Sequence, residues 1–187
     1  MKRLPIKYVV FNNVYKPSDD TFLLIDALEN IDVYNKKILE IGCGSGVISL
    51  YLAYKGGIVE AVDISEDAIK NTIYNAKLNN LSIKAYKSDL FSSVKGVYDI
   101  IIFNPPYLED RNRDYVTSYG TEIILDFLDS VGLHLNPGGQ TYFIINDKND
   151  YGLMLVSAKK SKVSLSIILR KKLFFEELYV VRGIKYA

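Results

Sequence analysis

The segment Asn104-Pro105-Pro106-Tyr107 carries groups suited to chemistry on a planar nitrogen. The lone pair of an amide or aromatic amine is delocalised, so such a nitrogen is a weak nucleophile. Two acceptors placed at its two hydrogens, the Asn104 side-chain oxygen and the Pro105 carbonyl, can help it pyramidalise in the transition state. Both prolines have a fixed φ and no N–H, which keeps the loop rigid, and Tyr107 offers a flat packing face. The same segment is also an ordinary strand-ending turn.

The segment Glu40-Ile41-Gly42-Cys43-Gly44-Ser45-Gly46 is a glycine-rich turn between an expected strand and the helix that follows it. Glycines let the backbone turn sharply and approach a ligand closely. The N-terminus of the next helix presents free N–H groups, which in dinucleotide-binding folds hold a pyrophosphate. The turn alone therefore leaves the ligand open.

Acidic residues at three strand ends narrow the choice of ligand. Asp63 ends the second expected strand, where a carboxylate accepts hydrogen bonds from ribose hydroxyls. Asp89 follows the third, where it can accept from an adenine amine while the Leu90 backbone addresses the ring. Glu40 directly precedes the glycines, so it would repel a pyrophosphate but attract an ammonium group. This combination predicts a cationic, phosphate-free ligand: S-adenosylmethionine, converted to S-adenosylhomocysteine.

Apolar runs of strand length alternate with amphipathic runs of helix length, which predicts an α/β fold with a mostly parallel sheet. We expect strands at Lys37–Ile41, Ile58–Val62 (ending at Asp63), Ser82–Tyr86, Tyr98–Phe103, Thr141–Ile145, Val163–Leu169 and Phe174–Arg182. We expect helices from Ser18 to about Asn30, over Val47–Tyr54, from Ser65 to about Asn79, and over Thr121–Leu135 and Tyr151–Lys160.

Three details of this pattern bear on topology. The continuous apolar character of Tyr98–Phe103 favours a central strand, covered on both faces. Only Arg170-Lys171-Lys172 separates the last two strands, so they should pair as an antiparallel hairpin. Ser18 can cap the first helix, and Pro137-Gly138-Gly139 reads as a turn before the fifth strand.

Length and charge are those of an ordinary globular chain. Its 187 residues suit one domain over residues 1–187, and 23 basic against 22 acidic residues disfavour a role that grips long nucleic acid. One cysteine excludes an intramolecular disulfide, and one histidine with one cysteine cannot build a His/Cys zinc site. We expect no bound metal, no membrane span and a cytoplasmic location.

Taken together, Glu40–Gly46, Asp63, Asp89 and residues 104–107 resemble class I S-adenosylmethionine-dependent methyltransferases that modify amino nitrogens. The run Val14-Tyr15-Lys16-Pro17-Ser18-Asp19-Asp20-Thr21-Phe22-Leu23-Leu24 is similar to the N-terminal signature of HemK-like release-factor glutamine N5-methyltransferases, in their short archaeal and eukaryotic branch. The resemblance covers essentially the whole chain. The Asn-Pro-Pro-Tyr segment is shared with adenine and cytosine methyltransferases, so the choice of glutamine rests on the Tyr-x-Pro-x-x-Asp-Thr signature.

The resemblance implies a Rossmann-like, seven-stranded sheet with helices on both faces, and residues 1–36 covering the active site. The implied catalytic residues are Asn104, Pro105, Pro106 and Tyr107. The implied cofactor-binding residues are Thr21, Glu40, Gly42, Gly44, Gly46, Asp63, Ile64, Asp89, Leu90 and Asn104. The implied substrate-binding residues are Tyr15, Asn104, Pro105 and Tyr107.

The resemblance also implies a substrate and a partner. The substrate would be the glutamine amide in the Gly-Gly-Gln loop of a translation release factor. Bacterial relatives carry an extra N-terminal helical domain, whereas only about 36 residues precede the first strand here. In the short branch a small zinc-binding activator subunit forms a heterodimer with the enzyme and covers an apolar sheet edge, and we expect the same here.

Other functions fit part of the pattern. An adenine-N6 methyltransferase acting on DNA or RNA is the main alternative, with Arg111, Arg113 and Lys171-Lys172 as candidate nucleic-acid contacts. A permissive site could also methylate other protein side chains, including lysine. A non-catalytic scaffold is disfavoured because Glu40, Asp63, Asp89 and Asn104 are all present.

Overall fold

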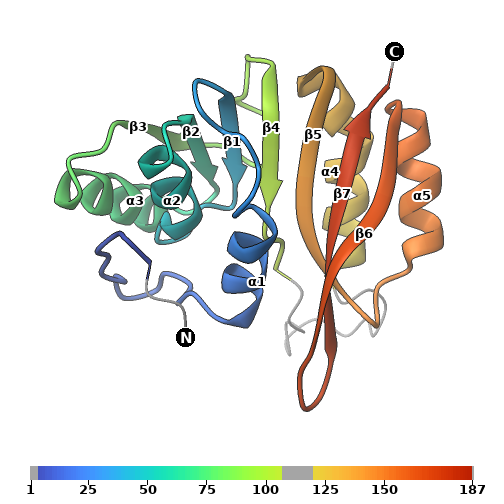
Figure 1. Cartoon of the computed structure of the whole chain (residues 1–187), viewed down its shortest axis with the longest axis horizontal. Helices are drawn as coiled ribbons and strands as arrows, with labels where there is room; N and C mark the ends of the chain where they lie inside the picture. Colours follow the sequence, from blue (N-terminus) through green and yellow to red (C-terminus); the bar gives the residue numbers. More distant parts are fainter. Residues whose placement is uncertain (1–3, 107–119, 187) are drawn as a thin grey trace.

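Seven strands form one sheet with the order β3-β2-β1-β4-β5-β7-β6 in the computed structural model, which describes residues 4–106 and 120–186 (Figure 1). The strands are β1 (Lys37–Ile41), β2 (Ile58–Asp63), β3 (Ile83–Lys87), β4 (Tyr98–Phe103), β5 (Leu135–Asn146), β6 (Val163–Lys172) and β7 (Glu177–Lys185). The helices are α1 (Asp19–Ala27), α2 (Val47–Tyr54), α3 (Glu66–Leu78), α4 (Thr121–His134) and α5 (Tyr151–Lys160).

Strands β1 to β5 pair in parallel, whereas β7 pairs antiparallel with both β5 and β6. The predicted C-terminal hairpin is therefore confirmed, and so is the central position of β4, which lies between β1 and β5. Because parallel strands all end at the same edge, the turns that follow β1, β2, β3 and β4 meet there. This edge is where an open α/β sheet binds ligands.

Helices cover both faces of the sheet, as the sequence pattern predicts. Successive side chains of a strand point to opposite faces, so Ile38 packs with α1 and α2 while its neighbour Leu39 packs with α4 and α5. In β4, Ile100 and Ile102 share the first face, whereas Ile101 faces the second. Both cores are dry apolar layers, which fixes the register of the strands and hence the positions of the turns that follow them.

The first helix differs from its prediction at both ends. It ends at Ala27, earlier than about Asn30, and the Ser18 side chain makes no capping hydrogen bond although Ser18 occupies the N-cap position. The Lys55 ammonium, from the end of α2, donates to the carbonyls of Leu28, Glu29 and Ile31 at 2.7–3.0 Å. A distant cation thus satisfies the carbonyls beyond the helix end, which a local pattern cannot reveal.

The expected turn at Pro137-Gly138-Gly139 lies inside a longer strand. Pairing with β4 already begins at Leu135, opposite Tyr98, and resumes at Gln140, opposite Ile100. The intervening residues leave the ladder as an irregularity, with Gly138 at φ +74°. The predicted separate turn and the predicted strand start at Thr141 were therefore wrong, because β5 begins at Leu135, directly after α4, and contains these residues as an irregularity.

The hairpin turn lies further along the chain than predicted. Arg170-Lys171-Lys172 belongs to β6, and β7 begins at Glu177 instead of Phe174. Phe174 and Phe175 occupy the turn itself, and their side chains are 92% and 88% exposed. Aromatic residues favour strands, so the pattern placed them in one, whereas here they lie outside the core.

An asparagine ladder on α3 holds the N-terminal segment in an extended conformation. Four helical residues rise about 6 Å, close to the roughly 6.6 Å that two extended residues span. Three asparagines spaced by four therefore meet every second residue of an extended chain running the other way. The backbone N–H groups of Lys7, Val9 and Phe11 donate to the side-chain oxygens of Asn79, Asn75 and Asn71 at 2.8, 3.0 and 2.8 Å.

We expect Asn75→Ala to lower the free energy of unfolding by about 2–4 kcal/mol, because it removes a buried donor and acceptor together. The Asn75 amide donates to the Val9 and Ser45 carbonyls as well as accepting from the Val9 N–H. Asn79→Ala is the matched control. Water can reach the Asn79 hydrogen bonds with Lys7, so its cost should stay below about 1 kcal/mol. Equal losses in urea titrations would contradict this account.

Candidate active site

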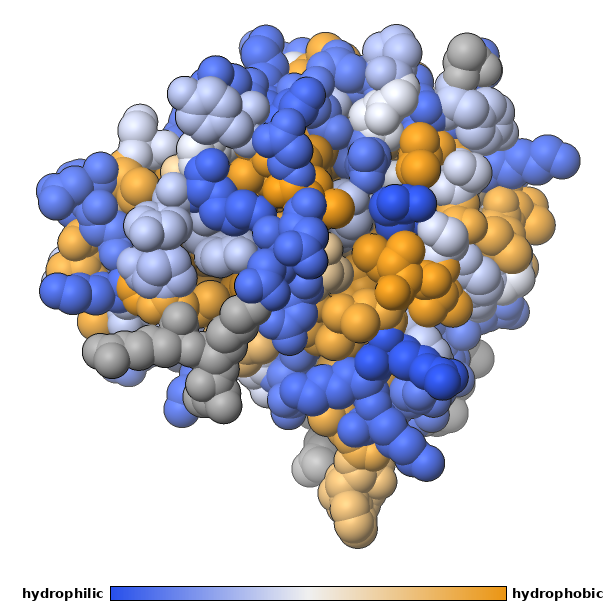
Figure 2. Space-filling view, viewed as in Figure 1, coloured by the Kyte–Doolittle hydropathy of each residue, from blue (hydrophilic) through white to orange (hydrophobic). Residues whose placement is uncertain are grey.

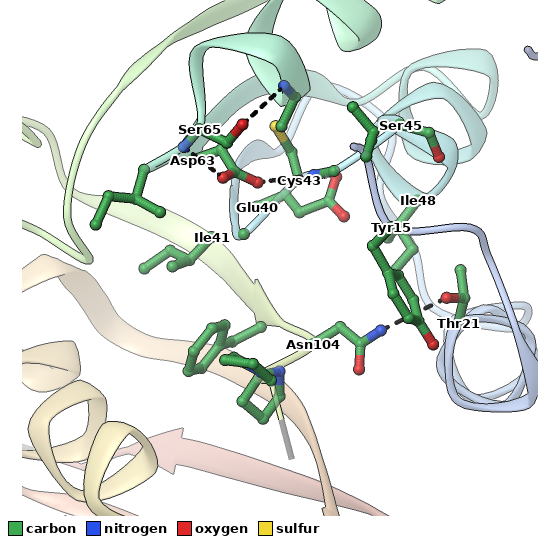
Figure 3. A pocket seen from close by; sticks show the side chains of 18 of the residues that line it. Tyr15, Thr21, Glu40, Ile41, Cys43, Ser45, Ile48, Asp63, Ser65 and Asn104 are labelled. Carbon is green, nitrogen blue, oxygen red and sulfur yellow. Dashed lines mark hydrogen bonds between the residues drawn. The ribbon is translucent and has the colours of Figure 1, made fainter. Parts of the chain in front are cut away.

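A cavity of about 360 Å³ opens at the carboxyl edge of the sheet and brings most of the predicted site residues together (Figure 3). It is lined by Tyr15, Thr21, Glu40, Gly42, Gly44, Asp63, Ile64, Asp89, Leu90, Asn104, Pro105 and Pro106, among others. Gly46, although predicted to bind the cofactor, does not line the cavity. It is the N-cap residue before α2, with φ +78°, and a Cβ there would lie 2.7 Å from the Thr72 hydroxyl oxygen. Tyr107 lies outside the described residues.

The Asn104 side chain is oriented by a buried carboxylate from α1. Asp20 is a carboxylate and can only accept, so the Asn104 amide nitrogen faces it, 3.1 Å from Oδ2. The same nitrogen lies 3.5 Å from the Thr21 hydroxyl oxygen (Figure 3). The Tyr15 hydroxyl donates to the same Asp20 oxygen at 2.9 Å. Residues from three separate segments thus form one hydrogen-bonded cluster.

The amide oxygen of Asn104 is left without a hydrogen-bond partner. It is buried, and no donor among the described residues reaches it. A buried unpaired acceptor costs about 1–3 kcal/mol, so native proteins rarely leave one without a purpose. Because Asn104 lines the cavity, this oxygen is placed to accept an N–H from a ligand.

Asp20 is a site residue that the sequence alone did not predict. It belongs to the Tyr-x-Pro-x-x-Asp-Thr signature, but the resemblance assigned it no role in the site. In the structure Asp20 is almost fully buried and its Oδ1 accepts from the Thr21 N–H at 2.5 Å and from the Thr21 hydroxyl at 3.1 Å. The signature itself contained a signal for this role. An acid that only stabilises the start of a helix needs no tyrosine at a fixed position five residues earlier, whereas Tyr15 donates a hydrogen bond to Asp20.

Glu40 is a buried carboxyl group at the other end of the cavity. Burial, the largest effect, raises the pKa of Glu40 from 4.5 to about 8, against the lowering effect of Ser49, whose N–H and hydroxyl both donate to it. The negative charge of Asp63 raises it further. In the described part of the chain, no Lys or Arg forms an ion pair with Glu40. A cationic ligand group would supply the missing partner.

Asp63 ties two turns together at the cavity wall. One of its oxygens accepts the Gly44 N–H at 2.9 Å, and the other accepts the Ser65 N–H at 2.9 Å (Figure 3). The glycine turn after β1 is thereby fixed against the turn after β2. Gly42 and Gly44 in that turn have φ values of +67° and +53°, the left-handed region that favours glycine.

The Asp89-Leu90 turn is held in an uncommon conformation. Leu90 has φ +42°, which is rare for a bulky residue and marks strain at functional sites. Hydroxyl groups maintain it: Ser88 Oγ donates to the Leu90 carbonyl at 2.8 Å, and Ser92 Oγ accepts from the Asp89 N–H at 3.1 Å. The strained turn leaves Asp89 exposed at the cavity rim, as a hydrogen-bond acceptor.

The lone thiol has a structural role. Burial raises the pKa of Cys43 well above its usual value, so it does not act as a thiolate. Among the described residues, no three His, Cys, Asp or Glu side chains are grouped to hold a metal ion. In the same ranges, every helix is too short or too polar to cross a bilayer.

Comparison with known proteins agrees with this geometry. The family model described as "Methyltransferase small domain" matches residues 13–166, which include every cavity residue named above. The chain belongs to the methyltransferase small domain family. A putative protein N5-glutamine methyltransferase of Methanocaldococcus jannaschii is 36% identical, over 95% of each chain. This relative confirms the resemblance of the present methyltransferase to HemK-like enzymes.

Two further similar proteins are named for different substrates, one a protein and the other a ribosomal RNA. The Mtq2–Trm112 complex of E. cuniculi, described as responsible for methylation of the eRF1 termination factor, has a TM-score of 0.75 and 26% identity, over 92% of this methyltransferase and 98% of that chain. Ribosomal RNA small subunit methyltransferase C of Alcanivorax borkumensis is 32% identical, but over 69% of this chain and 38% of its own length. The Rossmann-like methyltransferase fold is thus confirmed.

Proposed function

We propose that this chain is an S-adenosylmethionine-dependent methyltransferase that modifies the glutamine amide in the Gly-Gly-Gln loop of a translation release factor. The observation that carries the proposal is the buried Asn104 oxygen at the cavity, which has no hydrogen-bond partner in the described part of the chain. It is an acceptor held in place before any substrate arrives, and electrostatic preorganisation of this kind is the largest contribution to many enzymatic rates.

The residues around the cavity fit this cofactor. Glu40 can give up its proton when a ligand ammonium group binds beside it, so that a carboxylate faces the cation. Asp63 and Asp89 offer acceptors for ribose hydroxyls and an adenine amine. Gly42, Gly44, Ile64, Leu90 and Thr21 supply backbone and apolar walls. When bound, the cofactor supplies an electrophilic methyl group on a sulfonium.

The residues at the other end of the cavity would hold the acceptor nitrogen. Asn104 would accept one of its hydrogens, while Asp20 and Thr21 prevent the Asn104 amide from rotating. Pro105 is buried beside it and Pro106 is exposed at the cavity rim; we assign the Pro105 carbonyl as the second acceptor. Tyr15, half exposed with its hydroxyl on Asp20, would pack against the amide.

The choice of a protein glutamine rests on the relatives. The match to the M. jannaschii protein covers 95% of this chain, and that protein is named as a putative protein N5-glutamine methyltransferase. The E. cuniculi complex is named for methylation of a termination factor. A base in ribosomal RNA or DNA is the alternative, supported by the partial match to ribosomal RNA methyltransferase C. Translation factors as substrates would place the protein in the cytoplasm.

A label-transfer panel tests the proposal. We expect labelled S-adenosylmethionine to modify a release factor, and the label to vanish when the glutamine of its Gly-Gly-Gln loop is replaced by alanine. Oligonucleotides and ribosomal RNA complete the panel. Label that enters only nucleic acid would replace the leading proposal with the alternative.

A small activator subunit is the partner we propose, with zinc as its structural metal. The support is the E. cuniculi relative, which was solved as a two-protein complex, and the edge position of β3. Its outer backbone groups can pair with a strand from another chain. Full activity of the purified chain alone on a release factor would remove the need for this partner.

A further inference from the structure

The turn of the β6–β7 hairpin presents two phenylalanines to solvent. Phe174 and Phe175 are 92% and 88% exposed, the highest values among the exposed large apolar side chains of the described residues. Their rings meet edge to face, with centroids 4.6 Å apart. Figure 2 shows this tip as an isolated apolar protrusion beneath a hydrophilic surface.

Neither ring serves the fold. The turn is closed by the Leu173 N–H, which donates to the Glu176 carbonyl at 2.8 Å, and Leu173 rather than either phenylalanine packs against the core. Two-residue hairpin turns favour Asn, Asp and Gly, which relieve backbone strain. Two adjacent aromatic residues offer no such benefit, and their exposure to water is unfavourable. Contact with another molecule would explain why two phenylalanines occupy this turn.

The hairpin is fixed beside the active site. The Lys171 ammonium lies 2.7 Å from the Asp19 carboxylate, one residue before the Asp20 that orients Asn104. On the other side of the turn, the Asn146 amide donates to Glu176 Oε2 at 3.3 Å, and Asn146 ends β5, the neighbour of β4. The tip extends past the carboxyl edge of the sheet, the edge that carries the cavity (Figure 1).

Exposed cations lie next to the aromatic tip. Arg170 and Lys172 are both exposed and two residues apart on β6, so they share one face of the hairpin. Arginine and aromatic residues are enriched where proteins bind one another. The combination suits an apolar pocket bordered by acidic side chains on a folded partner.

We infer that the hairpin tip is a docking element for the protein substrate, binding an acid-rimmed apolar pocket away from the methylated glutamine. The inference rests on the proposed function, because a molecule held at the cavity mouth by the tip would be the one whose amide enters the cavity. A macromolecular acceptor gains from such a second contact, since it raises the effective concentration of its loop at the site.

The double substitution Phe174→Ala/Phe175→Ala tests the inference. With a folded release factor, we expect KM to rise at least about tenfold, the scale of losing interface aromatics, while kcat at saturation stays within about twofold. With a short Gly-Gly-Gln peptide, which lacks the docking pocket, kcat/KM should not change. The control Leu153→Ala/Val156→Ala removes exposed apolar side chains of α5 and should affect neither substrate.

A charge-reversal arm uses Arg170→Glu/Lys172→Glu, which should raise KM for the folded factor and weaken its dependence on salt. Unchanged KM in the aromatic double variant would overturn the docking role while leaving the proposed function intact. So would aromatic-dependent sedimentation with anionic vesicles, or aromatic-dependent dimers, alongside unchanged KM. Failure of the wild-type chain to label either factor or peptide, with the activator subunit present, would overturn both.

Discussion

Replacing Asn104 by alanine should lower kcat by about 100- to 1000-fold, by analogy with the range observed when one preorganised oxyanion-hole donor is removed. The affinity for S-adenosylmethionine should change by no more than a few-fold. The reason is geometric: among the described residues the Asn104 oxygen has no hydrogen-bond partner, so we expect its hydrogen bond to form only when the acceptor nitrogen is present. Single-turnover rates and direct cofactor titration separate the two quantities.

Asp20→Asn tests the same role of Asn104 with a smaller expected loss of kcat. The new amide can donate to the Asn104 oxygen and turn it away from the cavity, so kcat should fall at least about tenfold although Asn104 itself is intact. Asp63→Ala should have the opposite effect to Asn104→Ala, with a larger loss of cofactor affinity than of kcat. It removes the acceptor of the Gly44 and Ser65 N–H groups and should weaken cofactor binding first. Loss of cofactor affinity in Asn104→Ala equal to that in Asp63→Ala would mean that these roles are misassigned.

Replacing Glu40 by glutamine should weaken S-adenosylmethionine binding at least about tenfold and stabilise the ligand-free protein at alkaline pH. Burial raises the Glu40 pKa from 4.5 to about 8, which corresponds to about 5 kcal/mol at most for the cost of the buried charge. Glutamine keeps an acceptor for Ser49 without that charge. A ligand ammonium offsets the cost in the wild type, and the variant forgoes this attraction.

The pH dependence of stability follows from the direction of the Glu40 shift. The folded chain binds this proton more tightly than the unfolded chain does, so the stabilising contribution is complete below about pH 4.5. It is lost progressively as pH rises towards about 8. We therefore expect the wild type and Glu40→Gln to unfold at similar temperatures near pH 4.5. Above pH 8 the variant should be more stable by several degrees.

Two measurements separate this account from a general disturbance of the cavity. In calorimetry at pH 7, cofactor binding should release about one proton from the wild type and none from this site in Glu40→Gln. The fragment 5′-methylthioadenosine has no ammonium group, so both proteins should bind it equally. If both ligands lose the same affinity, Glu40 shapes the cavity and does not recognise charge.

Local patterns predicted most of the elements because each element buries an apolar face of its own. Lys37–Ile41, Val47–Tyr54, Tyr98–Phe103 and Tyr151–Lys160 match their predicted bounds, since burial and turn chemistry agree there. The hairpin was displaced because Phe174 and Phe175 have the composition of a strand but bury nothing. The end of α1 was misplaced because Lys55, distant in sequence, satisfies the carbonyls beyond it.

For the candidate active site, residue types and their spacing were enough to predict the kind of chemistry. Glycines at strand ends, acids at three of them and the Asn-Pro-Pro segment follow from residue type, and residue type fixes charge, donors and acceptors. How these groups face one another depends on the folded chain. In the fold, the Asp20 carboxylate accepts a hydrogen bond from the Asn104 amide nitrogen, and the Asn104 oxygen has no partner among the described residues. Glu40 is buried deeply enough for its pKa to rise. Orientation and desolvation arise from residues that the fold brings together across long stretches of chain, which no local pattern contains.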